Sequence, residues 1–251
     1  MTRPVKSHPR DRPYLALWVP GGSYHVYSRA VNGNLLFVDA RDVRKFREKL
    51  RRLLPFCELF ALACVGNHFH LHLRVRREDE IRARLLARQH RAVLGRRQRR
   101  WLAGDLSFQE LLGDAFARTL HAYTKAFNLR HGREGDLFNH TVRRRRVRGD
   151  LLSRRLVCYI HAQWVKHARG NGKVYGQGAS SSFAELIGEG RPSHLFAAAA
   201  VLARFGGRAA FIEQHRAYVA RRRGALRRFG EARFFGCETP RARAGRPVWL
   251  M

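Results

Sequence analysis

Three histidines, His68, His70 and His72, stand at alternate positions in the sequence. Because side chains of a β-strand alternate between its two faces, an extended segment would place all three on one face and Phe69 and Leu71 on the other. Neighbouring neutral imidazoles can share one divalent ion, and such an ion can polarise a phosphoryl oxygen. The spacing does not decide which two histidines would bind, and it also suits histidines that line a solvated sheet face.

A second set of residues with chemical potential lies far downstream, where Tyr159 and Gln163 are four positions apart in a segment with helical spacing. On a helix these two side chains share a face, one turn apart. A tyrosine can attack a phosphodiester and hold one end as a phosphotyrosine ester, and the glutamine carbonyl oxygen can bind the ion held by the histidines. A helical tyrosine is more often a core or rim residue. We expect His161 and His167 to be bystanders.

The charge balance points to a polyanionic partner. The chain of 251 residues has 50 Lys and Arg against 19 Asp and Glu, for a formal charge of +31. A coding bias can favour arginine over lysine, but it does not explain so large an excess of one sign. Phosphates of nucleic acid are the usual outlet for such an excess, so binding to nucleic acid is predicted.

Arginines gather where such binding is expected. A run of four on a predicted strand cannot all face a core, and beside the tyrosine helix it predicts a phosphate track. The candidate nucleic-acid-binding residues are Arg29, Arg143, Arg144, Arg145 and Arg146. Single-strand binders also stack bases on aromatic rings, for which the candidates are Trp101, Phe138 and Trp164, although each is better explained by core or rim packing.

The four cysteines, Cys57, Cys64, Cys158 and Cys237, form no CxxC pair, so neither a zinc knuckle nor a disulfide framework is indicated. A reduced, cytoplasmic and nucleoid-associated setting is expected. The basic residues 1–13 lack the apolar core of a secretory signal. Because no apolar run approaches the length that crosses a bilayer, no membrane partner is expected.

The order of predicted elements indicates one α+β domain with an appendage. Strands are predicted at 23–29, 57–65, 68–75 and 137–148, and helices from 39 or 42 to 54, at 108–130 and at 151–167. The segment 76–100 could be a surface helix or a basic loop. Short helices follow at 183–187 and 193–205, and a long basic helix follows at 209–229. This order predicts a ferredoxin-like antiparallel sheet with helices on one face. We divide the chain into a basic flexible arm (1–16), a main domain (17–170) and a helical, basic C-terminal extension (171–251).

Several spaced motifs in register resemble those of the REP-associated tyrosine transposases and the wider IS200-like transposases, within the HUH superfamily of single-strand DNA nucleases. HUH stands for His-hydrophobic-His, which here is His68-Phe69-His70. The other matching segments are YHVYSR at 24–29, FNLRHGREGDLF at 127–138, YIHAQ at 159–163 and SSSF at 180–183. The likeness spans roughly residues 14–229 in the family order.

The resemblance implies a catalytic domain at 17–170 with His68, His70 and Gln163 as ligands of Mg²⁺ or Mn²⁺ and Tyr159 as the nucleophile. It leaves His72 with a supporting or DNA-facing role. The implied reaction is cleavage and rejoining of single-stranded DNA at hairpins of palindromic repeats, through a 5′-phosphotyrosine. Because REP-associated members tend to be monomers and insertion-sequence relatives dimers, a monomer is favoured over a homodimer.

The chain also departs from the family pattern. Many REP-associated members continue the tyrosine block with Asn-Pro, whereas this chain has Gln163-Trp164, which is closer to the insertion-sequence branch and lets the helix run on. Val65-Gly66 replaces the common Met-Pro before the first histidine. One alternative is a non-catalytic nucleic-acid-binding descendant, against which the intact site residues argue. Another is a replication-initiation nuclease or relaxase, but relaxases usually place the tyrosine before the histidine pair.

Overall fold

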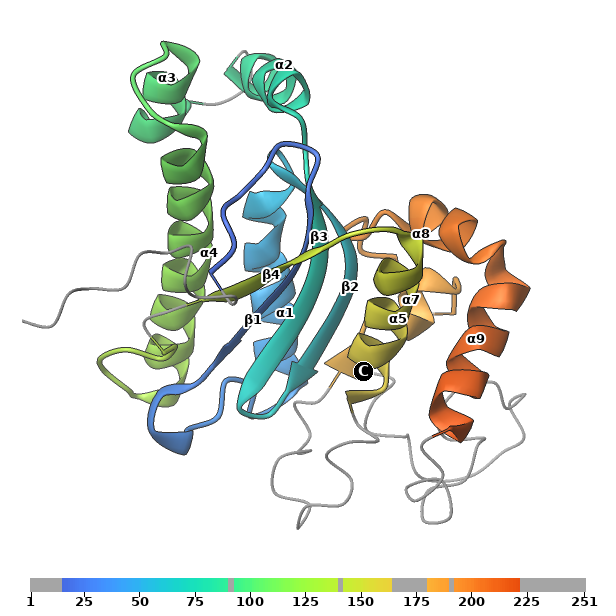
Figure 1. The fold of residues 1–251 in the computed structure, drawn as a ribbon. Helices are drawn as coiled ribbons and strands as arrows, with labels where there is room; N and C mark the ends of the chain where they lie inside the picture. The colour runs from blue at the N-terminus through green and yellow to red at the C-terminus, as the bar shows by residue number, and fades with distance from the viewer. Residues whose placement is uncertain (1–14, 90–92, 140–141, 164–179, 190–191, 222–251) are drawn as a thin grey trace, which may run out of the picture.

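The computed structural model describes residues 15–89, 93–139, 142–163, 180–189 and 192–221. Its centre is an antiparallel five-stranded sheet of strand order β4-β1-β3-β2-β5 (Figure 1). The strands are β1 (Ser23–Arg29), β2 (Cys57–Val65), β3 (His68–Val75), β4 (Arg143–Val147) and β5 (Ser180–Ser181). With α1 (Ala40–Leu50) and α4 (Phe108–His131), the chain order β1-α1-β2-β3-α4-β4 and the spatial order 4-1-3-2 are ferredoxin-like. The predicted α+β fold class is confirmed.

The other helices refine the predicted boundaries. They are α2 (Glu78–Gln89), α3 (Arg96–Leu102), α5 (Asp150–His161), α7 (Phe183–Leu186), α8 (Ala198–Phe205) and α9 (Arg208–Ala220). The basic segment 76–100 therefore contains two helices. The fourth strand begins at Arg143 rather than at 137. The arm up to residue 14, residues 164–170 and everything after 221 lie outside the described residues.

The tyrosine helix is interrupted where we expected it to continue to 167. Helix α5 ends at His161, Ala162 leaves helical geometry at φ −90° and ψ 15°, Gln163 is helical again, and 164–167 lie outside the described residues. The carbonyl oxygen of Tyr159 accepts a hydrogen bond of 3.0 Å from the side-chain Nε2 of Gln163. The glutamine side chain therefore folds back on the last turn of α5.

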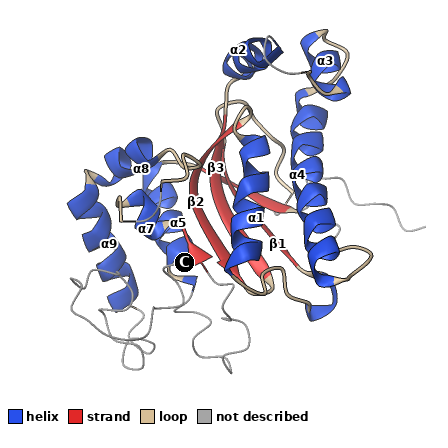
Figure 2. Cartoon of the chain, turned by 180° about the vertical axis from the view of Figure 1, so that it is seen from behind, coloured by secondary structure: helices blue, strands red, loops and turns tan. Residues whose placement is uncertain are grey.

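The main core lies between the sheet and the helices α1 and α4, which cover the same face (Figure 2). The apolar side of β3, with Phe69, Leu71 and Leu73, belongs to this core, as the alternation of its sequence predicted. A second apolar cluster lies on the opposite face, where Phe60 and Ala63 of β2 pack with α5, α7, α8 and α9. The tyrosine helix α5 therefore covers part of the histidine face of the sheet.

Strand β2 presents two adjacent side chains to the second cluster because its alternation changes phase midway. The pairing of β2 with β3 shifts register between Leu59 and Ala61, which is a β-bulge. Before the shift Leu59 joins the main core, and after it Leu62 does so, while Phe60 and Ala61 both join the second cluster. The bulge thus places two adjacent side chains under α5 without losing either half of the core face.

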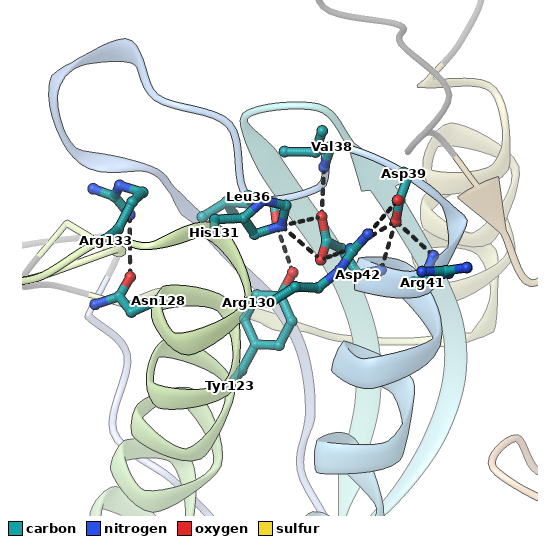
Figure 3. Close-up of polar contacts among 10 residues, drawn as sticks. All are labelled: Leu36, Val38, Asp39, Arg41, Asp42, Tyr123, Asn128, Arg130, His131 and Arg133. Atoms are coloured by element: carbon teal, nitrogen blue, oxygen red, sulfur yellow. Dashed lines mark hydrogen bonds and ion pairs between the residues drawn. The ribbon is translucent and has the colours of Figure 1, made fainter.

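A polar cluster ties the start of α1 to the end of α4 (Figure 3). Asp39 caps α1 by accepting hydrogen bonds from the backbone N–H groups of Arg41 and Asp42. Arg130 forms ion pairs with Asp39 and with the buried Asp42, which also accepts a hydrogen bond from the backbone N–H of Val38. Because the Arg130 guanidinium donates to it, the pKa of Asp39 lies well below its ordinary value. This cluster fixes the two helices against each other behind the sheet.

Candidate nuclease site on the sheet face under α5

The pairing of β3 with β1 places a second row of polar side chains beside the histidines. Residues directly opposite each other in an antiparallel pair point to the same side of the sheet. The pairs on this face are Arg29 with His68, Tyr27 with His70 and His25 with His72. All three histidines predicted to share a face do so, and each is buried.

The tyrosine of α5 reaches this face. The ring centroids of Tyr159 and His70 are 5.5 Å apart, with an edge-on interplanar angle of 77°. The ring of His25 is 6.0 Å from that of Tyr159, and the ring of Tyr27 is 5.8 Å from that of His70. The described chain therefore brings the predicted nucleophile beside one of its own predicted metal ligands, and it places a second tyrosine at the same site.

In the side-chain amide of Gln163 the nitrogen is hydrogen-bonded and the oxygen is not. Its Nε2 donates to the carbonyl oxygen of Tyr159. Its Oε1 is buried and has no hydrogen-bond partner among the described residues. An amide oxygen buried without a partner costs roughly 1–3 kcal/mol. A bound cation would satisfy it, since carboxamide oxygen is a ligand that Mg²⁺ and Mn²⁺ accept.

The histidines are oriented as metal ligands usually are. Nδ1 of His68 is 2.7 Å from Oδ1 of Asn67, and Nδ1 of His70 is 2.9 Å from Nε2 of His25. Ligation through Nε2 of His68 and His70 would leave both of these hydrogen bonds in place. The described residues contain no cluster of three or more His, Cys, Asp or Glu side chains suited to a metal. A metal here would therefore need the amide of Gln163 and water besides the two imidazoles, a donor set that suits Mg²⁺ or Mn²⁺.

His72 lies deeper than a DNA-facing residue could. Its side chain is 0% exposed, its ring packs edge-on against Phe60 with centroids 5.2 Å apart, and neither ring nitrogen has a hydrogen-bond partner among the described residues. Burial, and to a lesser degree the charges of Arg204 and His25, lower the pKa of His72 to about 3. His72 is thus a neutral residue beneath α5, and direct contact with DNA is excluded by its burial.

His25 is the site residue that reasoning from the sequence missed. It contacts both predicted halves of the site through His70 and Tyr159. Burial, with a smaller effect from the charge of Arg145, lowers the pKa of His25 to about 4, so its imidazole is neutral near pH 7. The alternation of His25, Tyr27 and Arg29 was a visible signal, but the neighbour of this strand in the sheet could not be inferred from spacing.

The four arginines of β4 divide between the two faces of the sheet. Arg143 and Arg145 pair with Tyr27 and His25, so they lie on the histidine face, and both are exposed. Arg144 and Arg146 lie on the other face. There Arg144 donates from Nε to the carbonyl oxygen of Ala16 at 2.6 Å, and its guanidinium lies 5.0 Å from the ring centroid of Trp18.

The remaining DNA-binding candidates differ in whether DNA could reach them. Arg29 is exposed at the end of β1, on the same face as its partner His68. Trp101 and Phe138 are buried in the main core, as packing residues are, and so cannot stack bases. Trp164 lies outside the described residues. Of the predicted DNA-binding arginines, Arg29, Arg143 and Arg145 therefore lie on the face of the candidate site.

A second polar constellation lies under the C-terminal helices. His215 of α9 has Nδ1 2.7 Å from the carbonyl oxygen of Phe211, so Nδ1 carries the proton and Nε2 accepts. Nε2 of His215 is 2.9 Å from Nδ1 of His161, and Nε2 of His161 is 2.9 Å from Oγ of Ser182. The serine hydroxyl therefore donates to His161, and it accepts from the backbone N–H of Leu62 at 3.0 Å.

This serine and histidine pair has the order of a hydrolase triad, but its burial gives it another role. Ser182 and His215 are 0% exposed, so no substrate reaches the hydroxyl. Burial lowers the pKa of His161 and His215, which keeps both imidazoles neutral. Every hydrogen bond of this network is then satisfied. The network ties β2, the tyrosine helix α5 and the C-terminal helix α9 together. His161, expected to be a bystander, is thus a link between the site helix and the extension.

No protein-family model matches this sequence, and no curated protein matches it. Among solved structures, the chain is similar to a REP-associated tyrosine transposase bound to a REP hairpin, with a TM-score of 0.45 and 13% sequence identity. The match covers 73% of this chain and 87% of that chain. This is the family that the sequence motifs resemble. None of the helices in the described part of the chain is long and apolar enough to cross a membrane.

Proposed function

We propose that this protein is a metal-dependent DNA strand transferase that cleaves and rejoins single-stranded DNA at hairpin-forming repeats. Tyr159 would be the nucleophile, with His68, His70 and Gln163 as ligands of Mg²⁺ or Mn²⁺. The observation that carries the proposal is the 5.5 Å approach of the Tyr159 ring to that of His70, which unites two motifs from distant parts of the sequence. Hairpin DNA as the substrate rests on the resemblance of those motifs to the transposase family.

The proposed chemistry is an in-line exchange of phosphodiester bonds. The phenolic oxygen of Tyr159 forms a bond to phosphorus while the bond from phosphorus to the 3′ oxygen breaks, and the phenol proton finally resides on the released 3′-OH. One end of the DNA remains as a 5′-phosphotyrosine ester, and attack by a 3′-OH on this ester reverses the step. A bound divalent ion would supply polarisation of the phosphoryl oxygen.

The other residues of this face have supporting roles in the proposal. His25 holds the imidazole of His70 through Nδ1, which fixes the nitrogen offered to a metal. Arg29, Arg143 and Arg145 lie on the same face and can bind phosphates of the strand. Because Tyr159 lies beside the histidines of its own chain, the arrangement supports a monomer that cleaves in cis.

The test is formation of a covalent adduct between the protein and a hairpin-bearing DNA strand, resolved under denaturing conditions with Mn²⁺ or Mg²⁺. We expect Tyr159→Phe to bind the hairpin as the wild type does and to form no adduct. Tyr27→Phe is the matched control, because Tyr27 also lies near His70, and it should still form the adduct.

Four results would contradict the proposal in different ways. An adduct with Tyr159→Phe would reject the nucleophile, and its loss in Tyr27→Phe alone would transfer the role to Tyr27. Undiminished cleavage by His68→Ala would reject the metal site. Tight hairpin binding without any adduct, in either metal, would favour the non-catalytic descendant.

A further inference from the structure

A cavity opens between α5 and α9 with Tyr159 in its wall. Its volume is about 440 Å³, and its other lining residues are Arg155, Leu156, Tyr218 and Arg221. This lies toward the lower end of the range of about 300–1,000 Å³ that is usual for sites of small ligands. The cavity therefore has the size for one nucleotide rather than for a duplex.

Each helix contributes one aromatic ring and one guanidinium to the cavity. Arg155 and Tyr159 are four residues apart on α5, so they lie on one face of that helix. Tyr218 and Arg221 are three residues apart at the end of α9. The two tyrosines pack against the second apolar cluster, which anchors their rings from below. Both tyrosines are half-buried and line the cavity.

The two arginines give the cavity a positive charge that the described protein does not neutralise. Both side chains belong to exposed residues, and no ion pair to either is found within the described ranges. A guanidinium binds phosphate through two parallel hydrogen bonds, and a tyrosine ring is a stacking surface for any base. An aromatic wall with two such cations is suited to a nucleotide of a single strand.

The position of the cavity extends the site in one direction. Arg143 and Arg145 lie on β4, at one edge of the sheet, and α5 covers β2 and β3 near the other edge. In Figure 1 α9 lies beyond α5 on the side away from β4. A strand that contacts the β4 arginines and passes Tyr159 would therefore lead into the cavity.

We propose that this cavity binds one unpaired nucleotide next to the scissile phosphate, with its base on Tyr218 and its phosphate on Arg155 and Arg221. The inference rests on the proposed function, because it takes Tyr159 to be the point of cleavage. It adds a subsite for the single-stranded flank, so that the protein recognises more than the hairpin stem.

The test compares two DNA probes, a hairpin from a palindromic repeat bordering the coding sequence and the same hairpin with unpaired flanks on both sides. Wild-type protein should bind the flanked probe more tightly than the bare hairpin. Tyr218→Ala should lose about tenfold in affinity for the flanked probe, the size expected when one stacked base loses its platform. Its affinity for the bare hairpin should not change.

Three further variants separate stacking and charge from folding. Tyr218→Phe keeps the ring and should bind the flanked probe as the wild type does. Arg155→Gln and Arg221→Gln should lower the salt dependence of flanked-probe binding, each by the equivalent of about one phosphate contact. A 2-aminopurine placed next to the cleavage point should be quenched by the wild type and by Tyr218→Phe, but not by Tyr218→Ala.

Equal binding of the flanked probe by Tyr218→Ala and wild type would overturn the subsite, and so would an equal loss for both probes. These results are independent of the proposed catalysis. If the wild type formed no adduct but bound the flank through Tyr218, the proposed reaction would fail while the subsite stood. If adducts formed and Tyr218 had no effect on the flank, the reverse would hold.

Discussion

Nδ1 of His161, on the helix that carries Tyr159, lies 2.9 Å from Nε2 of His215 on α9. Because His215 must donate from Nδ1 to the carbonyl of Phe211, the direction of every proton from α9 to Ser182 is determined. A helix that is distant in sequence thus holds the helix of the proposed nucleophile through buried hydrogen bonds. The C-terminal extension is part of the structure that positions the site.

We expect Ser182→Ala to destabilise the protein. The substitution would leave the backbone N–H of Leu62 and Nε2 of His161 buried without a partner. Each such loss costs roughly 1–3 kcal/mol, so the free energy of unfolding should fall by about 2–4 kcal/mol in urea titrations. Ser181→Ala is the matched control, because among the described residues Oγ of Ser181 makes only a long contact of 3.4 Å, with the backbone N–H of Phe183. Equal stability of the two variants would contradict the role of the network.

The same network should make stability depend on pH. Burial lowers the pKa of His215 from 6.5 to about 4, so between these values the unfolded chain binds the proton first. The contribution of neutral His215 is complete above pH 6.5 and is lost as the pH falls toward 4. The loss is at most about 3 kcal/mol, with a slope near 1.4 kcal/mol per pH unit.

The variant for this test is His215→Phe, which cannot titrate and sits among Phe183, Phe205 and Phe211. It should be less stable than the wild type at pH 7, since Nδ1 of His161 loses its acceptor. Between pH 6.5 and 4.5 its free energy of unfolding should fall less steeply with pH than that of the wild type. The difference in slope should correspond to one bound proton. Parallel curves for the two proteins would show that His215 does not titrate as its burial implies.

Arginines on opposite faces of β4 should differ in DNA binding. Arg145 lies on the histidine face and Arg146 on the other, and both are exposed. Arg145→Gln should weaken hairpin binding and reduce the slope of affinity against salt by about 0.7–0.9 of a charge, as loss of one phosphate contact does. Arg146→Gln should change neither value. Filter binding from low to physiological salt measures both, and equal effects would place DNA on both faces.

The clamp between α1 and α4 should matter for stability but not for the chemistry. Asp42→Asn weakens the ion pair of the buried Asp42 with Arg130 and the contact with His131 shown in Figure 3. Because Arg130 is partly exposed and keeps its ion pair with Asp39, we expect the loss of one charge-assisted hydrogen bond, about 1.5–3 kcal/mol in the free energy of unfolding. Arg41→Ala is the control, because only the backbone of Arg41 takes part in the cluster. Loss of adduct formation by folded Asp42→Asn would give the clamp a catalytic role that its place behind the sheet does not suggest.

His25 should support metal binding without being a ligand. His25→Leu removes the acceptor at Nδ1 of His70, and loss of such an outer partner typically lowers metal affinity about 10–100-fold. Titration with Mn²⁺ followed by electron paramagnetic resonance measures this without relying on turnover. His72→Leu is the control, because the described structure gives its ring nitrogens no partner, and its Mn²⁺ affinity should match that of the wild type. Similar losses in both variants would reflect general damage to the sheet.

Local patterns predicted much of this fold. Alternating histidines and apolar residues fixed both faces of β3, and the turn at Gly66-Asn67 gave the β2–β3 hairpin. The long helix α4 was predicted from its apolar stripe. The end of α5 was not, because it coincides with a side chain of Gln163 folding back on Tyr159, which helical periodicity does not record.

The site itself was only half visible in the sequence. The meeting of Tyr159 with His70 was inferred from motif resemblance, since nothing in the spacing brings residues so distant together. His25 depends on the pairing of β1 with β3, and His215 on a contact across 54 residues. Such non-local pairings are set by the whole core. For the same reason, the sequence predicted that Arg143 to Arg146 would be divided between two faces, but it did not predict which pair would face the site.

The bulge between Leu59 and Ala61 constrains how related chains can diverge. A relative that lacks the extra residue, Phe60, would pair Leu59 and Ala61 with Leu73 and His72 in regular alternation, and its later apolar positions would keep their faces. A gap of one residue beside Phe60 therefore needs no change of hydrophobic pattern in 62–65, whereas a relative that kept the length of β2 but lost the bulge would need a reversed hydrophobic phase there.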